Sequence, residues 1–95
     1  MGGFGLTIND INIFAEENGL EITILDNPSY ESAIVGLSSN YEVIYDYDLM
    51  IEYLIKDGMS LDDAIDFIEY NTMRAIPYVH SRNKPIILCI KDFTF

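Results

Sequence analysis

Apolar residues recur at helical spacing in three parts of the chain, the first of which is residues 8–18. Thr7 precedes this part and can accept a hydrogen bond from the first turn, and Asp10 stands where it would complete a capping box. Gly19 follows the last turn and suits the left-handed conformation that ends many helices. The pattern therefore predicts a helix over residues 8–18.

A second helix is predicted between Asp46 and Asp57-Gly58. Asp46 and Asp48 can each cap its start, and both carboxylates suit the positive end of a helix dipole. Its apolar face consists of Leu49, Met50, Tyr53 and Leu54.

A third helix is predicted to begin after Ser60, which has Asp63 in a capping-box-like position. It should end before Pro77, because proline moves the preceding residue out of the helical region. The short connection Gly58-Met59 makes the second and third helices an αα-hairpin. The apolar stripe of the third helix consists of Leu61, Ala64, Ile65, Ile68 and Thr72.

Four stretches have the β-branched or alternating composition of strands, namely residues 21–25, 32–37, 41–45 and 85–91. Ser38-Ser39-Asn40 separates the second stretch from the third, which predicts a hairpin with a bulge at Gly36. The fourth stretch is almost continuously apolar, so we expect it to be covered on both faces or to be central in the sheet.

Together these elements predict an α+β fold in the order α-β-β-β-α-α-β. We expect a small, mainly antiparallel sheet of about four strands with the helices packed on one face. The length suits a single domain over residues 1–95, in which the glycine-rich residues 1–6 form a flexible N-terminus. The first residues lack the features of a signal peptide, and no apolar run approaches the ~18–20 residues that span a bilayer.

Charge changes this picture more than any motif does. Sixteen acidic and five basic residues give a net charge of −11 at pH 7. Fifteen of the acidic residues lie in residues 1–69 together with a single basic residue, Lys56, whereas residues 70–95 are net basic. A field of this sign repels nucleic acid and anionic membranes and favours basic protein partners.

The acidic residues concentrate on the predicted second and third helices, beside a tyrosine-rich stretch. Carboxylates three and four residues apart share a helical face, and tyrosines are enriched at binding hot spots. Such a row of carboxylates can imitate a nucleic-acid backbone to a basic protein. The candidate partner-binding residues are Asp46, Tyr47, Asp48, Glu52, Asp62, Asp63, Asp66 and Glu69.

Two alternative roles for these acidic residues stay open. They can form a solvated surface with carboxylates placed to suit helix N-termini, or they can hold magnesium through carboxylates alone. An EF-hand loop is excluded, because Leu49-Met50 follow Asp46-Tyr47-Asp48 and no glycine stands at the sixth position. We predict neither a metal site nor a cofactor.

The single cysteine, Cys89, lies in an apolar run, so we expect a buried and inert thiol. The single histidine, His80, has no second histidine or cysteine close to it in sequence, which argues against a zinc site. A nucleophilic pair of these two residues is a lesser alternative. We predict no catalytic residues and a protein that is not an enzyme.

A resemblance to other proteins is carried by three segments of the chain, Tyr45–Leu54, Asp57–Tyr78 and Pro85–Ile87. In these segments the chain resembles a group of small, uncharacterised acidic proteins from low-GC bacteria and their phages. The resemblance implies a cytoplasmic setting in a bacterial host cell. It implies no activity and no functional residue.

The leading interpretation is a small, acidic, non-enzymatic interaction protein encoded by a phage or mobile element. We expect it to bind a basic protein partner, with no direct contact to nucleic acid or membrane. Charge mimicry would inhibit a host nucleic-acid-binding or defence protein, as anti-CRISPR proteins do. The alternatives are a bacterial structural or regulatory domain and a metal-dependent enzyme. A homodimer is compatible with the sequence, although like charge opposes self-association.

Overall fold

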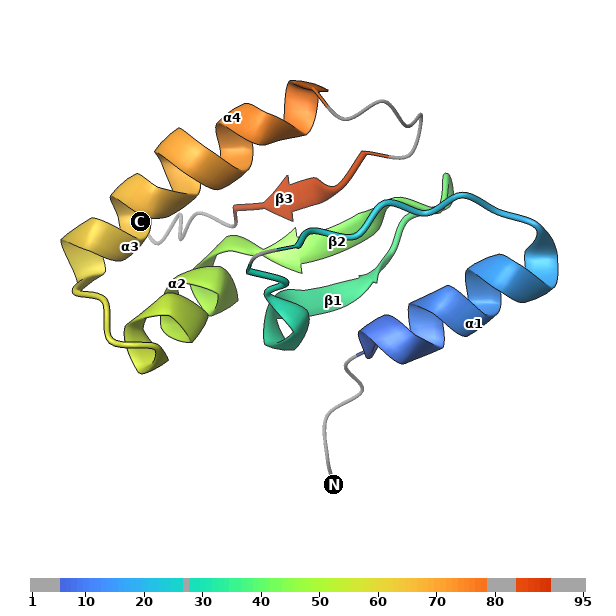
Figure 1. The fold of residues 1–95 in the computed structure, drawn as a ribbon, viewed down its shortest axis with the longest axis horizontal. Coiled ribbons are helices and arrows are strands. Elements are labelled where there is room, and N and C mark those ends of the chain that lie inside the picture. Colours follow the sequence, from blue (N-terminus) through green and yellow to red (C-terminus); the bar gives the residue numbers. More distant parts are fainter. Residues whose placement is uncertain (1–5, 27, 79–83, 90–95) are drawn as a thin grey trace, which may run out of the picture.

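The computed structural model describes residues 6–26, 28–78 and 84–89. Within these residues the fold is α+β, with the order α-β-β-α-α-β and a three-stranded mixed sheet. The predicted sheet of four mainly antiparallel strands is therefore wrong. The elements in Figure 1 are α1 (Ile8–Asn18), β1 (Ile34–Leu37), β2 (Val43–Asp46), α2 (Tyr47–Lys56), α3 (Leu61–Phe67), α4 (Met73–Ala75) and β3 (Ile86–Leu88).

The strand order in the sheet is β1-β2-β3. β1 and β2 form the predicted antiparallel hairpin, and their register shifts between Ile34 and Gly36, which confirms the bulge. β3 pairs with β2 in parallel, because the intervening helices carry the chain back to the other end of the sheet. β3 is thus an edge strand, and its three residues are partly buried or exposed. The prediction of a strand that is central or covered on both faces is therefore wrong. Residues 90–91 of the predicted strand lie outside the described part.

Residues 21–25, predicted to be a strand, have no strand partner in the sheet. The backbone N–H of Leu25 instead donates a hydrogen bond to the Tyr45 hydroxyl at 2.9 Å. Ile22 and Ile24 pack against the core. The β-branched composition of this segment therefore reflects burial and not strand pairing.

α1 begins and ends where its local sequence predicts. The Thr7 hydroxyl accepts a hydrogen bond from the N–H of Asp10 at 3.0 Å, and the Asp10 carboxylate accepts one from the N–H of Thr7 at 3.2 Å. Both halves of the capping box are therefore present. Gly19 ends the helix with a φ of +63°. Residues 1–5 of the predicted flexible terminus lie outside the described part, and Leu6 packs against the core.

The third predicted helix continues without interruption over residues 61–75, and we call this the long helix. α3 and α4 are its ends, and π-helical turns over Ile68–Thr72 join them. A 3₁₀ turn, Ile76–Tyr78, follows, so the regular helix stops before Pro77 as predicted. Leu61, expected in the apolar stripe, is exposed instead.

The core lies where the sheet meets the helices. In β2, Val43 and Tyr45 are fully buried and alternate with partly exposed neighbours, so one face of this strand is covered. In the view of Figure 1, the long helix lies beyond the β3 edge of the three strands, and α1 lies beyond the β1 edge. Among the described residues, none of the helices combines the length and apolar character needed to cross a membrane. The buried apolar residues are Ile11, Tyr30, Ala33, Ile34, Val43, Tyr45, Met50, Leu54, Ala64 and Ile68.

Candidate functional site

Four of the predicted partner-binding carboxylates lie on the outward sides of α2 and the long helix. Asp48 and Glu52 are exposed and stand two residues before and after the buried Met50, which places them on the opposite side of α2. Asp62 and Asp66 stand in the same relation to a buried alanine, Ala64, of the long helix. Each helix therefore presents carboxylates away from its own buried face. We call the exposed candidate carboxylates of the two helices the acidic surface, which consists of Asp48, Glu52, Asp62, Asp63, Asp66 and Glu69.

A hydrogen bond joins the two helices at the edge of this acidic surface. The Tyr47 hydroxyl donates to Glu69 Oε2 at 3.3 Å, although the two residues are 22 positions apart in the sequence. Partial burial raises the pKa of Tyr47, and the negative charge of Glu69 raises it further. The hydroxyl thus stays protonated and remains a donor to the carboxylate. The start of α2 consequently lies beside the π-helical turns of the long helix.

Two further candidates lie where helices begin. Asp46 caps α2, because its carboxylate accepts a hydrogen bond from the N–H of Leu49 at 3.0 Å. The Ser60 hydroxyl caps α3 by accepting from the N–H of Asp63 at 3.2 Å. Asp46 is partly buried, whereas the Asp63 side chain is exposed. The Asp46 carboxylate therefore serves to cap the helix, whereas the Asp63 carboxylate faces solvent.

The carboxylates of the acidic surface are not paired with cations in the part of the chain that the structure describes. No ion pair there involves a carboxylate of α2 or the long helix. Arg74 lies over the Tyr70 ring, with its guanidinium carbon 5.0 Å from the ring centroid. The Lys84 ammonium donates to the carbonyl of Pro77 at 3.1 Å. Within residues 6–26, 28–78 and 84–89, no three His, Cys, Asp or Glu side chains gather as metal ligands would.

Cys89 is exposed, which corrects the prediction of a buried thiol. The reason is that β3 is an edge strand that ends at Leu88. Cys89 therefore lies just after the strand, at the edge of the sheet. The thiol lines a hollow together with Tyr47, Glu69 and Met73. His80, its suggested catalytic partner, lies outside the described residues.

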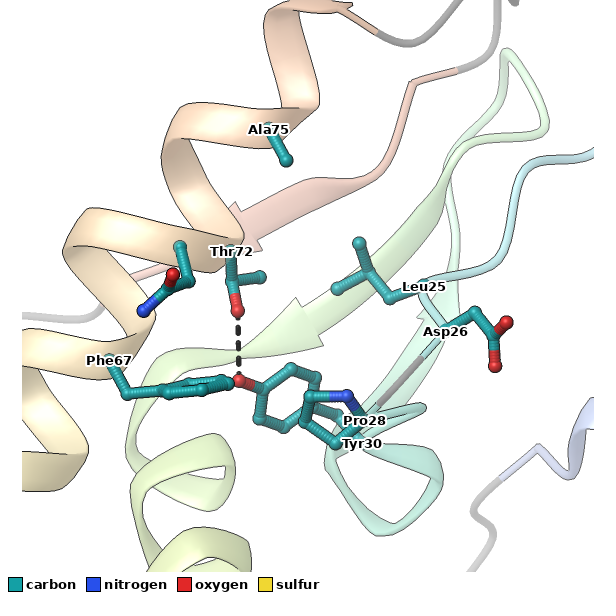
Figure 2. Close-up of a pocket in the computed structure, with 8 residues that line it drawn as sticks. Leu25, Asp26, Pro28, Tyr30, Phe67, Thr72 and Ala75 are labelled. Carbon is teal, nitrogen blue, oxygen red and sulfur yellow. Dashed lines mark hydrogen bonds between the residues drawn. The ribbon is translucent and has the colours of Figure 1, made fainter.

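A second hollow, which the sequence did not predict, lies between the long helix and the segment that precedes β1. It is a cavity of about 170 Å³. At this cavity the Tyr30 hydroxyl and Thr72 Oγ1 are 2.9 Å apart. Their hydrogen bond is the dashed line in Figure 2. No sequence signal marked it, because the two residues are 42 positions apart and the π-helical turns have no motif. We call it the Tyr30–Thr72 cavity. Its lining residues are Leu25, Asp26, Pro28, Tyr30, Phe67, Asn71, Thr72 and Ala75.

No protein-family model, curated protein or solved structure matches this chain.

Proposed function

We propose that this protein is a small, acidic, non-enzymatic interaction protein of a phage or mobile element. It binds a basic protein partner in the cytoplasm of a bacterial cell through the carboxylates of α2 and the long helix. By covering a basic groove, it keeps nucleic acid from a host defence or nucleic-acid-binding protein. The observation that supports this proposal is the outward placement of these carboxylates without ion pairs among the described residues.

The charge density of the surface supports a mimic built from two helices. Carboxylates four residues apart on one helix, such as Asp48 and Glu52 or Asp62 and Asp66, are separated by a rise of ~6 Å. A single DNA strand carries one charge per ~3.4 Å of axis. One helix therefore supplies roughly half of that density, and a second adjoining helix is needed to approach it. The Tyr47–Glu69 hydrogen bond holds the two helices together at this point.

In this proposal the charges of the acidic surface act mainly on the rate of association with the partner. A surface of one sign attracts an oppositely charged groove and raises the association rate constant, whereas the dissociation rate depends more on close contacts. Salt screens the attraction, with a Debye length of about 8 Å at physiological ionic strength. We therefore expect fast association at low salt and a steep decrease in its rate as salt is added.

A pair of charge-matched variants tests the proposal. Glu52→Lys with Asp66→Lys reverses two exposed charges on the acidic surface, and Glu16→Lys with Glu17→Lys reverses two exposed charges on α1. Both double variants have the same net charge. A partner isolated from low-GC bacterial lysate with the wild-type protein is then measured against all three proteins by surface plasmon resonance.

We expect the first variant to associate at least ~10-fold more slowly at low salt, and the second to stay within a few-fold of the wild type. Equal losses in both variants would show that only net charge matters, and no loss in either would place the interface elsewhere. An association rate that does not change with salt would rule out electrostatic attraction. Circular dichroism of each variant checks that the fold is retained.

A further inference from the structure

Two unusual backbone arrangements meet at the Tyr30–Thr72 cavity. Tyr30 has a φ of +51°, in the left-handed region that bulky side chains rarely adopt. On the other side, Thr72 ends the π-helical turns. Such turns are rare in proteins, and those that occur lie frequently at functional sites. The hydrogen bond between these two side chains joins them and is itself buried. Strained backbone of this kind persists where the surrounding structure holds it, and it clusters at ligand sites.

The size of the cavity suits one small ring. Its volume of about 170 Å³ is close to the ~150 Å³ of an apolar cavity that is known to hold benzene. Leu25, Phe67 and Ala75 contribute apolar wall, and Figure 2 shows them around the Tyr30–Thr72 hydrogen bond. Ala75 is exposed, so the cavity reaches solvent near this residue.

The lining also favours a neutral ligand. Among the described residues, no lysine or arginine lines the cavity, so none of them offers an anion a counter-charge there. Asp26 is the one charged residue among the described residues that line it, and in Figure 2 its carboxylate points away from Tyr30 and Thr72. The Tyr30 side chain has no exposed surface, and its hydroxyl is already paired with Thr72. A charged group placed inside would therefore lose its hydration without gaining a counter-charge.

We propose that the Tyr30–Thr72 cavity is a binding site for a small neutral molecule with a single aromatic ring. The ring occupies the space between Leu25, Phe67 and Ala75, and burial of its apolar surface supplies the affinity. This site is separate from the acidic surface, and the proposal does not depend on the partner-binding function.

The probe ligand is benzene, and the decisive control is a variant whose cavity is filled by a larger side chain. Ala75→Leu adds a larger side chain at the cavity, at an exposed position that should tolerate it. Met73→Leu places the same leucine on the same helix outside this cavity, again at an exposed residue, with little change in side-chain volume. The three proteins are compared with and without benzene by thermal unfolding and by methyl NMR.

We expect benzene to raise the Tm of the wild type and of Met73→Leu in a concentration-dependent way, since it binds the native state alone. It should also shift the methyl signals of Leu25, Thr72 and Ala75. Ala75→Leu should lose both effects while remaining folded. Absence of both effects in the wild type, or equal effects in Ala75→Leu, would overturn the proposal. Benzoate and benzylammonium test neutrality, because binding of either as tight as that of benzene would contradict it.

Discussion

At the scale of single residues, a side-chain hydroxyl accepts a backbone hydrogen bond that a neighbouring strand would normally accept. The N–H of Leu25 reaches the Tyr45 hydroxyl, while the Tyr45 ring is fully buried in the core. A buried backbone donor needs a partner, and this contact supplies one without a fourth strand. The sequence of residues 21–25 could not reveal this, because the same apolar composition suits a strand and a buried irregular segment alike.

Tyr45→Phe tests this contact and its dependence on pH. The variant should lose about 1 kcal/mol of stability near neutral pH, because the N–H of Leu25 loses its partner. Burial raises the pKa of Tyr45 above its ordinary value of about 10. The unfolded state therefore releases this proton at lower pH than the native state does, and native stability decreases as the pH rises above about 10. Urea unfolding across alkaline pH should show a shallower decrease for the variant, and identical slopes would contradict this account.

The Tyr30–Thr72 hydrogen bond allows a double-mutant cycle. Tyr30→Phe and Thr72→Val each leave one hydroxyl buried and unpaired, at a cost of about 1–3 kcal/mol. The double variant removes both hydroxyls, so it should cost clearly less than the sum of the single changes. Urea unfolding of the four proteins measures the coupling energy. Additive losses would show that the hydrogen bond does not couple the two sites.

At the scale of elements, the parts that the sequence predicts are those whose signals are local. The capping box at Thr7 and the glycine at the end of α1 act within one turn of the helix, and both are present as predicted. The parallel entry of β3 and its edge position depend on contacts between distant segments. The exposure of Cys89 follows from that edge position. Pattern and composition describe burial well but do not specify which strand pairs with which.

The features of the candidate site that depend on local spacing were predicted, and those that depend on packing between helices were not. Seven of the eight predicted residues have carboxylates, and the sequence predicts the outward side of each helix from spacing alone. The contact between Tyr47 and Glu69 was not predicted, since it requires the packing of α2 against the long helix. The π-helical turns were not predicted either, because Ile68–Thr72 fits an ordinary α-helical pattern.

Two glycines allow the effect of backbone strain to be measured apart from the effect of steric crowding. A Cβ atom at either Gly19 or Gly36 would meet no atom within 4 Å, but only Gly19 has a positive φ, of +63°. Gly19→Ala should therefore destabilise the protein by about 1–2 kcal/mol, which is the cost of the left-handed conformation. Gly36→Ala should be neutral or stabilise by up to about 1 kcal/mol, through the lower entropy of the unfolded chain. Equal effects in thermal unfolding would show that φ is not the cause.

At the scale of the whole molecule, the net charge of −11 acts on the fold as well as on partners. The molecule measures 39 × 36 × 31 Å, and the Debye length is about 30 Å at 0.01 M salt. At that ionic strength nearly every carboxylate repels every other across the molecule. At about 0.15 M the Debye length is about 8 Å, so only neighbouring charges still interact. Unfolding lets the charges move apart, which means that repulsion destabilises the compact state.

Sodium chloride should therefore raise the free energy of unfolding of the wild type between about 0.01 and 0.15 M, where the Debye length shortens most. Glu16→Lys with Glu17→Lys replaces two negative by two positive charges, so this variant should gain less from the same salt. Urea unfolding at each ionic strength measures both proteins. Equal gains would point to a general salt effect on hydrophobic burial in place of screening. A wild type that loses stability with salt would mean that attractive pairs outweigh the repulsion, against the absence of ion pairs on α2 and the long helix among the described residues.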